Sequence, residues 1–381
     1  MEDPYSARLP LGRPGRHPGV RCRSGDCRWA TSVESGAQIM QERVDDERAS
    51  GGGNASSARP GDAVGDGGSG VSFDHASVML DEIVETLSEV PNGLVVDATL
   101  GGAGHASALL AANDGLSILG LDRDEMALGA AEARLAPHGE RVALRHTRFD
   151  GLADAVHSLG VEHLSGALFD LGVSSPQLDL ADRGFSFRHD GPLDMRMDRS
   201  QGPTAADLVN STDERALVGI LQRNGDERHA RRIARAIVAA RPLHTTAELA
   251  EVVRDAVPAA ARRGSGHPAR KTFQAIRIEI NDELVILEDA LRQALDLLAP
   301  TGRCAVLAYH SGEDRIVKNV FRSRAGEGPR PRADLPPPPG HEATVKLLWR
   351  GARRPAEAEI VRNPRAEAAR FRAVEKLGAV A

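Results

Sequence analysis

Residues 95–122 decide the fold class, and they read VVDATLGGAGHASALLAANDGLSILGLD. An apolar run ends in Asp97, a glycine-dense turn follows at 101–104, and a small-residue segment leads to a second apolar run that ends in Asp122. This order predicts a strand, a tight loop, a helix and a second strand, the first half of a nucleotide-binding βαβ unit. Glycines let the loop backbone approach a ligand, and the terminal acid can accept hydrogen bonds from both hydroxyls of a ribose.

The glycine spacing distinguishes two kinds of nucleotide loop. A dinucleotide enzyme requires G-x-G-x-x-G, in which the last glycine packs the helix against the sheet. Here Asp97 precedes Gly101 by four positions, and the next glycines are Gly102 and Gly104. This arrangement resembles the first motif of the class I S-adenosylmethionine methyltransferases more than a pyrophosphate loop. The alternative is a glycine-rich turn in an unrelated α/β protein, but Asp122 at the end of the next strand favours a cofactor site.

Composition limits the class of protein. The chain has 381 residues, enough for two or three domains, and its net charge of −6 provides no global attraction to nucleic acid. Any nucleic-acid surface must therefore be a local patch. Three cysteines are too few for a disulfide framework, and Cys304 lies in an apolar run typical of a core strand. No apolar run reaches the ~20 residues needed to span a membrane, and no secretion signal is present, so we expect a cytoplasmic location.

Apolar patterns divide the chain into a sheet-forming part and a helical insert. Strand patterns recur up to Asp170 and return at 304–309, whereas the intervening segment shows only helix patterns. We predict an α/β fold, a class I methyltransferase (Rossmann-like) sheet with an inserted α-helical domain. The predicted divisions are a disordered extension at 1–70, the methyltransferase domain at 71–178 and 274–323, the helical insert at 179–273, and a C-terminal part at 324–381. This last part contains a proline-rich linker, an edge strand at 344–349 and a basic helix at 366–377.

Polar residues follow the fourth and fifth predicted strands. Asp170 ends the fourth strand, and His310 follows the fifth. In open α/β sheets, ligands bind at the carboxyl ends of the strands, so Asp170 should lie beside the glycine loop and Asp122 and contact the substrate. The alternative is that Asp170 holds a loop. His310 is a candidate for orienting substrate or relaying a proton, with a hydrogen-bonded structural turn as the alternative.

Two stretches are candidates for RNA contact. Residues 182–198 mix aromatics, arginines and acids with no period, which is typical of a recognition loop. Phe185 and Phe187 could stack on an unstacked base, or could anchor the loop to the core. The insert also carries a cluster of arginines with few acids, which is either a phosphate-binding face or a solvated one. The predicted RNA contacts are Arg183, Phe185, Arg196, Arg231, Arg232 and Arg235.

Five blocks in the chain, at 75–82, 170–177, 183–198, 272–277 and 310–315, together resemble the bacterial ribosomal RNA small-subunit methyltransferase H (MraW) family. The resemblance covers roughly 73–321 and returns weakly at 363–365. It implies methyl transfer from S-adenosylmethionine to N4 of a cytidine in 16S rRNA, at the P-site side of the decoding centre, with 16S rRNA or the 30S subunit as partner. It requires no metal. The oligomeric state stays open, with a homodimer as one alternative.

The resemblance also implies roles for individual residues. The implied cofactor contacts are Gly101, Ala103, Gly104, His105, Asp122, Phe149, Asp170 and Gln177, and the implied catalytic residues are Asp170 and His310. The chain departs from the family pattern at Ala103, where glycine is frequent, and at Gly312, where leucine is frequent. We expect alanine at 103 to be tolerable if its φ is negative. Gly312 is expected to loosen the turn that holds His310.

The enzyme is expected to act by orienting the cytosine amino group and by placing a negative charge next to it. The amino lone pair of cytosine is delocalised into the ring, and a carboxylate such as Asp170 that accepts a hydrogen bond from the amino group would localise it. Two rival functions remain: a methyltransferase acting on DNA or on a small molecule, and a non-catalytic RNA-binding or assembly protein. The chain lacks the Asp/Asn/Ser-Pro-Pro-Tyr tetrapeptide of amino-methylating DNA enzymes, and the helical insert with its arginines argues against a small-molecule substrate.

Overall fold

The computed structural model describes residues 77–260, 262, 266–327 and 342–378. The extension expected at 1–70 and the four prolines of the expected linker, 336–339, lie outside the described residues. No helix in the described part of the chain is long and apolar enough to cross a membrane.

The described residues form a seven-stranded sheet with the order β3-β2-β1-β4-β5-β7-β6. Strands β1 to β5 run parallel to one another, whereas β7 is antiparallel to both β5 and β6. The strands are β1 (Gly93–Asp97), β2 (Leu116–Asp122), β3 (Val142–His146), β4 (Leu164–Asp170), β5 (Leu298–Ala308), β6 (Val345–Leu347) and β7 (Arg370–Lys376). This is the order of a class I methyltransferase sheet, which confirms the predicted fold class.

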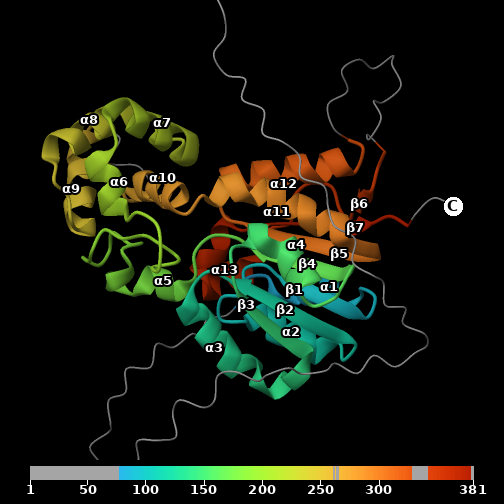
Figure 1. The fold of residues 1–381 in the computed structure, drawn as a ribbon. Coiled ribbons are helices and arrows are strands. Elements are labelled where there is room, and N and C mark those ends of the chain that lie inside the picture. Colours follow the sequence, from blue (N-terminus) through green and yellow to red (C-terminus); the bar gives the residue numbers. More distant parts are fainter. Residues whose placement is uncertain (1–76, 261, 263–265, 328–341, 379–381) are drawn as a thin grey trace, which may run out of the picture. The chain divides into compact units, whose positions relative to one another are not determined.

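Helices cover both faces of the sheet, so its central strands are apolar on both sides. Successive strand residues point to opposite faces, and Val95 and Val96 accordingly belong to two different core clusters. Val95 packs on the side of α1 (Leu80–Ser88), α2 (Gly104–Ala112) and α3 (Glu125–Leu135). Val96 packs on the side of α4 (Leu152–His157), α11 (Glu283–Leu297) and α12 (Ser311–Arg324), the layer drawn above the sheet in Figure 1.

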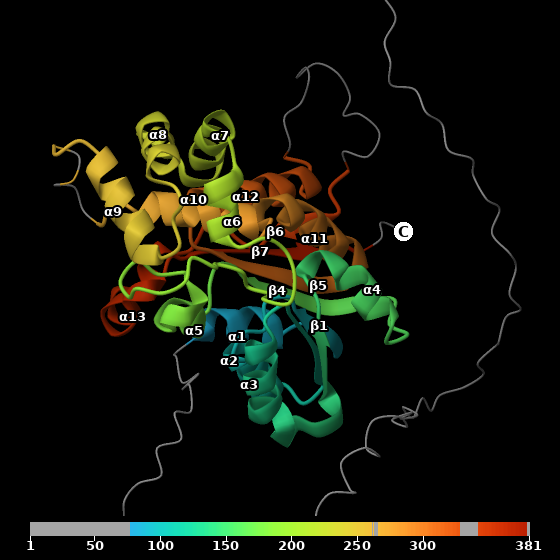
Figure 2. The same ribbon diagram turned by 60° about the vertical axis from the view of Figure 1, so that its left-hand side comes forward.

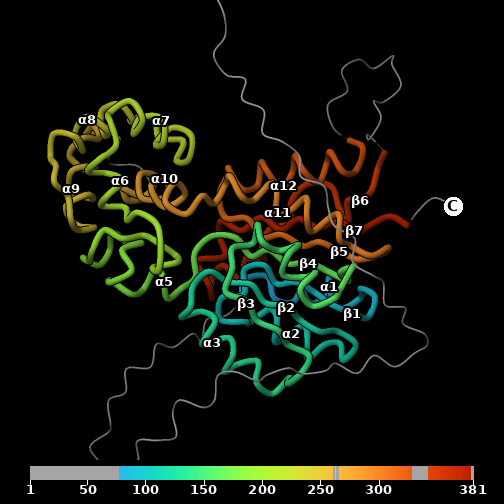
Figure 3. The backbone as a smooth tube through the Cα atoms, in the orientation of Figure 1, coloured from blue at the N-terminus to red at the C-terminus, as the bar shows by residue number. Residues whose placement is uncertain are grey.

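The chain between β4 and β5 folds into further helices with an apolar core of their own. They are α5 (Ser175–Asp179), α6 (Ala205–Ser211), α7 (Glu214–Gly225), α8 (Ala230–Ala240), α9 (Thr246–Ala256) and α10 (Arg270–Ile280). Leu221, Ile233, Leu249 and Phe273 belong to the core that α6 to α10 share. Figures 2 and 3 show these helices grouped beside the sheet, with the chain returning to it from α10 into α11. The boundary predicted at residue 273 therefore falls inside a helix.

Short 3-10 turns connect several elements: η1 (Ala136–Arg141), η2 (Phe149–Gly151), η3 (Ala181–Arg183) and η5 (Pro364–Ala368). The last of these follows the short helix α13 (Glu357–Arg362).

The C-terminal secondary structure is partly different from the prediction. The edge strand expected at 344–349 is confirmed as β6, but the basic helix expected at 366–377 is wrong. Residues 370–376 form β7, which pairs with β5 on one side and β6 on the other. Phe371 is buried between the half-buried Arg370 and Arg372, and this alternation has the two-residue period of a strand. The backbone of β7 also completes the hydrogen bonds of β5.

Candidate active site

A cleft of about 1250 Å³ opens at the carboxyl ends of the parallel strands. Its walls come from the loop after β1, the ends of β2, β4 and β5, η2, the insert loop around Phe185 and Phe187, and the segment between α13 and η5. This is the edge at which ligands bind in open α/β sheets. The structure thus brings the glycine loop, Asp122 and Asp170 together in one cleft, as the strand pattern predicted.

Asp122 holds the glycine loop in place. Its Oδ2 accepts a hydrogen bond from the Gly101 N–H at 2.8 Å, and its Oδ1 accepts one from the Asp124 N–H at 2.9 Å. Burial raises the pKa of this carboxyl, whereas the backbone donors lower it. Each oxygen has a second lone pair, and the side chain lines the cleft, so the carboxylate can accept bonds from a ligand diol.

Ala103 adopts a left-handed conformation with φ +58° and ψ +28°. The condition under which alanine was expected to be tolerable, a negative φ, is therefore not met, and the residue carries a conformational cost of about 1–2 kcal/mol that glycine would avoid. Ala103 is fully buried at the start of α2 and provides no side-chain cap, so the N–H groups of the first turn are left without a side-chain acceptor. A helix start of this kind can bind a carboxylate.

Asp170 lies at the end of β4 with one face toward the cleft, where its side chain is 26 % exposed. The phenol of Tyr309 donates a hydrogen bond to its Oδ1 at 2.7 Å, and His105 Nδ1 lies 3.7 Å from its Oδ2. The imidazole Nε2 of His105 contacts the carbonyl of Val78 at 2.9 Å, which fixes the ring. Burial raises the pKa of Asp170, and His105 and the Tyr309 hydroxyl lower it.

Asp97, the last residue of β1, is a further buried carboxyl, and the glycine motif begins at this position. Its Oδ1 accepts a hydrogen bond from the Thr99 N–H at 3.2 Å. Burial raises its pKa to about 7, the Thr99 hydrogen bond opposes this, and the charges of Asp170 and Asp122 add to the rise. Asp97 therefore titrates close to neutrality.

His310 caps α12. Its Nδ1 accepts hydrogen bonds from the N–H groups of Gly312 and Glu313, and its Nε2 lies 3.1 Å from Glu313 Oε1. Both ring nitrogens thus face atoms of the first turn of α12, which is the structural turn named as the alternative. A side-chain carbon at Gly312 would lie only 3.0 Å from this imidazole, so glycine gives the ring its space. The expected loosening is not evident in these contacts.

Gln177 and Phe149 both line the cleft. The buried amide of Gln177 donates to Asp124 Oδ2 at 2.9 Å and accepts from the Ser174 N–H at 3.0 Å. Its polar atoms thus hold the loop after β4 against α3. Phe149 packs edge-to-face on Phe169, with ring centroids 6.2 Å apart, and presents an apolar surface to the cleft.

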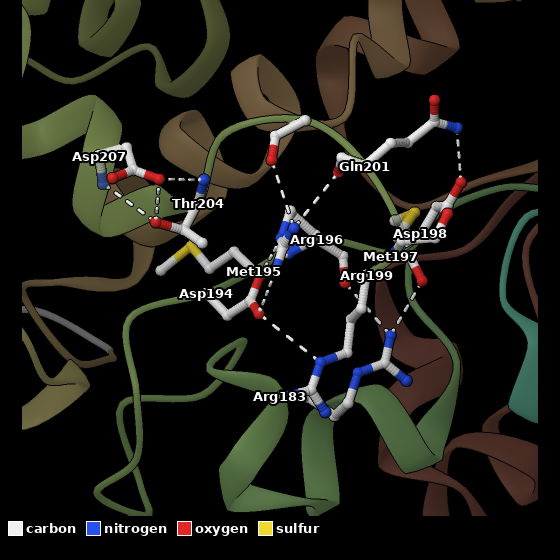
Figure 4. A network of polar contacts seen from close by, with 12 residues as sticks. Arg183, Asp194, Met195, Arg196, Met197, Asp198, Arg199, Gln201, Thr204 and Asp207 are labelled. Carbon is white, nitrogen blue, oxygen red and sulfur yellow. Dashed lines mark hydrogen bonds and ion pairs between the residues drawn. The ribbon is translucent and has the colours of Figure 1, made fainter.

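Two of the arginines predicted to contact RNA have guanidinium groups that bond to other residues of the protein (Figure 4), and Arg196 is partly exposed whereas Arg183 is buried. The side chain of Arg183 is 1 % exposed, donates to Asp124 Oδ2 at 2.7 Å, and donates to the carbonyls of Arg196 and Met197. Arg196 forms a bidentate pair with Asp194 at 2.7 and 3.0 Å. These contacts correct the expectation of RNA binding for both, because their donors already stabilise the loop from 183 to 199.

The remaining RNA candidates differ in exposure. Phe185 is buried, which matches the alternative of a loop anchor, although its ring also lines the cleft. The side chains of Arg231, Arg232 and Arg235 are exposed on α8, where Arg235 has only a loose contact of 3.8 Å with Glu214. These three stay candidates for phosphate contact.

The model of the MraW methylase family matches residues 72–377. The chain belongs to this family. Proteins named "Ribosomal RNA small subunit methyltransferase H" are among its relatives. The one from Thermobifida fusca is 50% identical over 308 residues, which cover 79% of this chain and 93% of that protein. Those from Mycobacterium sp. (strain KMS) and Parafrankia sp. (strain EAN1pec) are 50% and 48% identical and cover 81% and 80% of this chain and 85% and 95% of their own length.

The residues of this MraW methylase fit S-adenosylmethionine. The cleft offers a carboxylate at the end of β2 for the ribose hydroxyls, the ring of Phe149 for the adenine, and the uncapped start of α2 for the methionine carboxylate. Asp170 lies at the same end of the sheet, at the junction of this region with the insert loop.

Sequence reasoning missed Tyr309 as the partner of Asp170 in this MraW methylase. Tyr309 ends the segment 304–309 that was predicted to be a strand. Its role depends on β5 lying next to β4, with Asp170 opposite Leu307. Strand order is not a local signal. His267, which also lines the cleft, was missed because it is distant in sequence from every strand that forms the site. Arg365 lies in the segment 363–365, where the family resemblance returns, but it was not named as a site residue.

Proposed function

We propose that the chain transfers the methyl group of S-adenosylmethionine to N4 of a cytidine in the 16S rRNA of the small ribosomal subunit. Membership of the MraW methylase family and about 50% identity to proteins named ribosomal RNA small subunit methyltransferase H support the reaction class. The observation that carries the proposal is the position of Asp170, a carboxylate oriented by Tyr309 in the same cleft as the glycine loop and Asp122.

In this proposal Asp170 acts on the acceptor. When bound, S-adenosylmethionine supplies a methyl group already activated by its sulfonium. Asp170 accepts a hydrogen bond from the cytosine amino group, localises its lone pair and aligns it for attack. The negative charge also stabilises the positive charge that develops on the amino nitrogen. Tyr309 keeps the carboxylate in the required orientation.

His310 is better placed as a positioning residue than as a proton relay. Its ring caps α12 and lies against Glu313, and Glu313 Oε2 accepts a hydrogen bond from the Tyr309 N–H at 2.8 Å. His310 therefore acts on Asp170 through Glu313 and Tyr309. The product proton can leave to water, because the cleft is open to solvent at Asp170.

The helical insert, residues 179–273, is proposed to recognise the RNA. Its helices pack on a core separate from the sheet, and the exposed Arg231, Arg232 and Arg235 give α8 a positively charged face. Arg231 and Arg232 lie in the first turn of α8, where positive charge is unfavourable for the helix dipole, which argues for a role outside folding. Phosphate groups of the rRNA are suitable partners.

The test is methyl transfer with labelled S-adenosylmethionine to 30S subunits, and in parallel to naked 16S rRNA, both from a strain that lacks this gene. Mass spectrometry of the nucleosides should show one N4-methylcytidine. Label in duplex DNA, or in another nucleoside, would overturn the assignment. Tight binding of 30S subunits without any transfer would favour the non-catalytic assembly protein.

A further inference from the structure

Three arginines at the opening of the cleft have side chains that form no polar contact with other residues that the structure describes. Arg188, Arg270 and Arg362 all line the cleft and are exposed. Within residues 77–260, 262, 266–327 and 342–378, the guanidinium groups of these three make no hydrogen bond or ion pair, in contrast to those of Arg183 and Arg196. They come from three separate parts of the chain: the insert loop, the first residue of α10 and the last residue of α13.

An aromatic pair lies at the same opening. The imidazole of His267 stacks on the ring of Phe187, with centroids 4.4 Å apart and planes inclined by 17°. Phe187 in turn packs edge-to-face on Phe273, a residue of the insert core, with centroids 5.4 Å apart. His267 Nδ1 accepts a hydrogen bond from the Ala269 N–H at 3.2 Å, so the exposed ring has a fixed orientation. One face of His267 is thus supported by protein, and both rings line the cleft.

The neighbouring acids do not neutralise this region completely. Asp179 forms an ion pair with Arg365 at 2.7 Å, and Arg365 also contacts Ser175, the first residue of α5. Glu367 is an exposed acid of the same wall. The guanidinium groups of Arg188, Arg270 and Arg362, which have no partner among the described residues, outnumber this acid. The opening therefore carries a net positive charge close to where a base must enter.

We infer that this opening, defined by His267 on Phe187 together with Arg188, Arg270 and Arg362, binds the RNA strand that flanks the acceptor cytidine. The inference rests on the proposed function. A base that reaches Asp170 must leave its stack, so an adjacent base loses a stacking partner. His267 replaces that partner, and the arginines contact the phosphates on either side. The site is distinct from the exposed arginines of α8.

The first test measures equilibrium binding to 30S subunits, by filter binding and without cofactor, as a function of salt. The variant Arg188→Gln/Arg270→Gln/Arg362→Gln should bind about tenfold to a hundredfold more weakly, and the slope of log K against log salt should flatten by about 2 to 3. Its affinity for S-adenosylmethionine should not change. The matched control is Arg254→Gln/Arg292→Gln/Arg322→Gln, which removes three exposed, acid-paired arginines away from the cleft. Equal affinities of variant and control would overturn the inference.

The second test separates stacking from capping at His267. His267→Asn keeps an acceptor for the Ala269 N–H but removes the ring, whereas His267→Phe keeps a ring but loses the acceptor. Stacking predicts that the asparagine variant binds 30S subunits at least about fivefold more weakly and that the phenylalanine variant binds like the wild type. Retained binding by asparagine, or equal loss in both variants, would contradict the stacking role.

The binding assay also separates the two proposals. If the wild-type protein binds 30S subunits but transfers no methyl group, the proposed reaction fails, while the affinities of the variants still decide the inference. If it binds neither 30S subunits nor naked 16S rRNA, both fail.

Discussion

The hydroxyl of Tyr309 lies 2.7 Å from Asp170 Oδ1 and joins the ends of two adjacent parallel strands. Asp170 ends β4, and Tyr309 follows β5 directly. A carboxylate held by its neighbouring strand keeps one orientation, which is what an acceptor for a substrate amino group requires. The two residues are therefore best tested together.

Asp170→Asn should lower kcat by roughly 10²–10³, because it retains shape and one acceptor oxygen but removes the charge. The affinity for S-adenosylmethionine should change much less, since the glycine loop and Asp122 provide separate contacts. Single-turnover methylation of 30S subunits at saturating cofactor measures the effect. A variant as fast as the parent would leave Asp170 a structural residue.

Tyr309→Phe should shift the acidic limb of the pH–rate profile to higher pH. Burial raises the pKa of Asp170, and the Tyr309 hydroxyl opposes that rise, so removing the hydroxyl raises the pKa further. The reaction needs the ionised carboxylate, and activity is therefore lost at a higher pH as the solution is acidified. In an Asp170→Asn background the same substitution should cause no such shift. An unchanged profile in the single variant would mean that another group controls this limb.

Asp122→Ala should weaken S-adenosylmethionine binding by about 1.5–3 kcal/mol, the range for hydrogen bonds to a charged group. The substitution also removes the acceptor of the Gly101 N–H, so calorimetry should be repeated with Asp122→Asn, which keeps one acceptor oxygen and restores part of the loop support. Unaltered affinity in both variants would exclude Asp122 from the cofactor site.

In the wild type, the free energy of unfolding should fall as the pH rises from about 4 to 7, and Asp97→Asn should make this fall smaller. The pKa of Asp97 is about 7 in the folded protein, compared with an ordinary value of 3.8. Between these two values the folded protein binds the proton more tightly than the unfolded chain does, so the free energy of unfolding falls as the pH rises. A shift of three pH units corresponds to at most about 4 kcal/mol. Urea unfolding at pH 5 and pH 8 measures the difference. The exposed Asp154→Asn is the control, and a wild-type-like pH dependence in Asp97→Asn would contradict the assignment.

The elements that were predicted correctly carry local signals. The apolar runs that end in Asp97, Asp122 and Asp170 alternate between two buried faces, and burial on both sides demands such runs. These patterns were sufficient to place the cleft and the acids that line it.

The predictions that were wrong concern features that depend on burial or on residues far apart in the sequence. Arg183 and Arg196 look like recognition residues in the sequence, but whether an arginine reaches solvent is decided by acids such as Asp124, 59 residues away from Arg183. The segment 370–376 was read as a helix because its basic residues and alanine suit one, and the pairing with β5 overrode that preference. The left-handed backbone of Ala103 likewise has no signature in the residue itself.

The position of β7 has a consequence for the time course of synthesis. This strand comes from the last residues that the structure describes, yet it lies between β5 and β6 rather than at an edge. While the nascent chain is still shorter than about residue 376, β5 has an open side with unpaired backbone donors and acceptors. The sheet beside Asp170 and Tyr309 is therefore completed only after residue 376 has been synthesised, and a stop codon before residue 370 would remove an interior strand of the sheet.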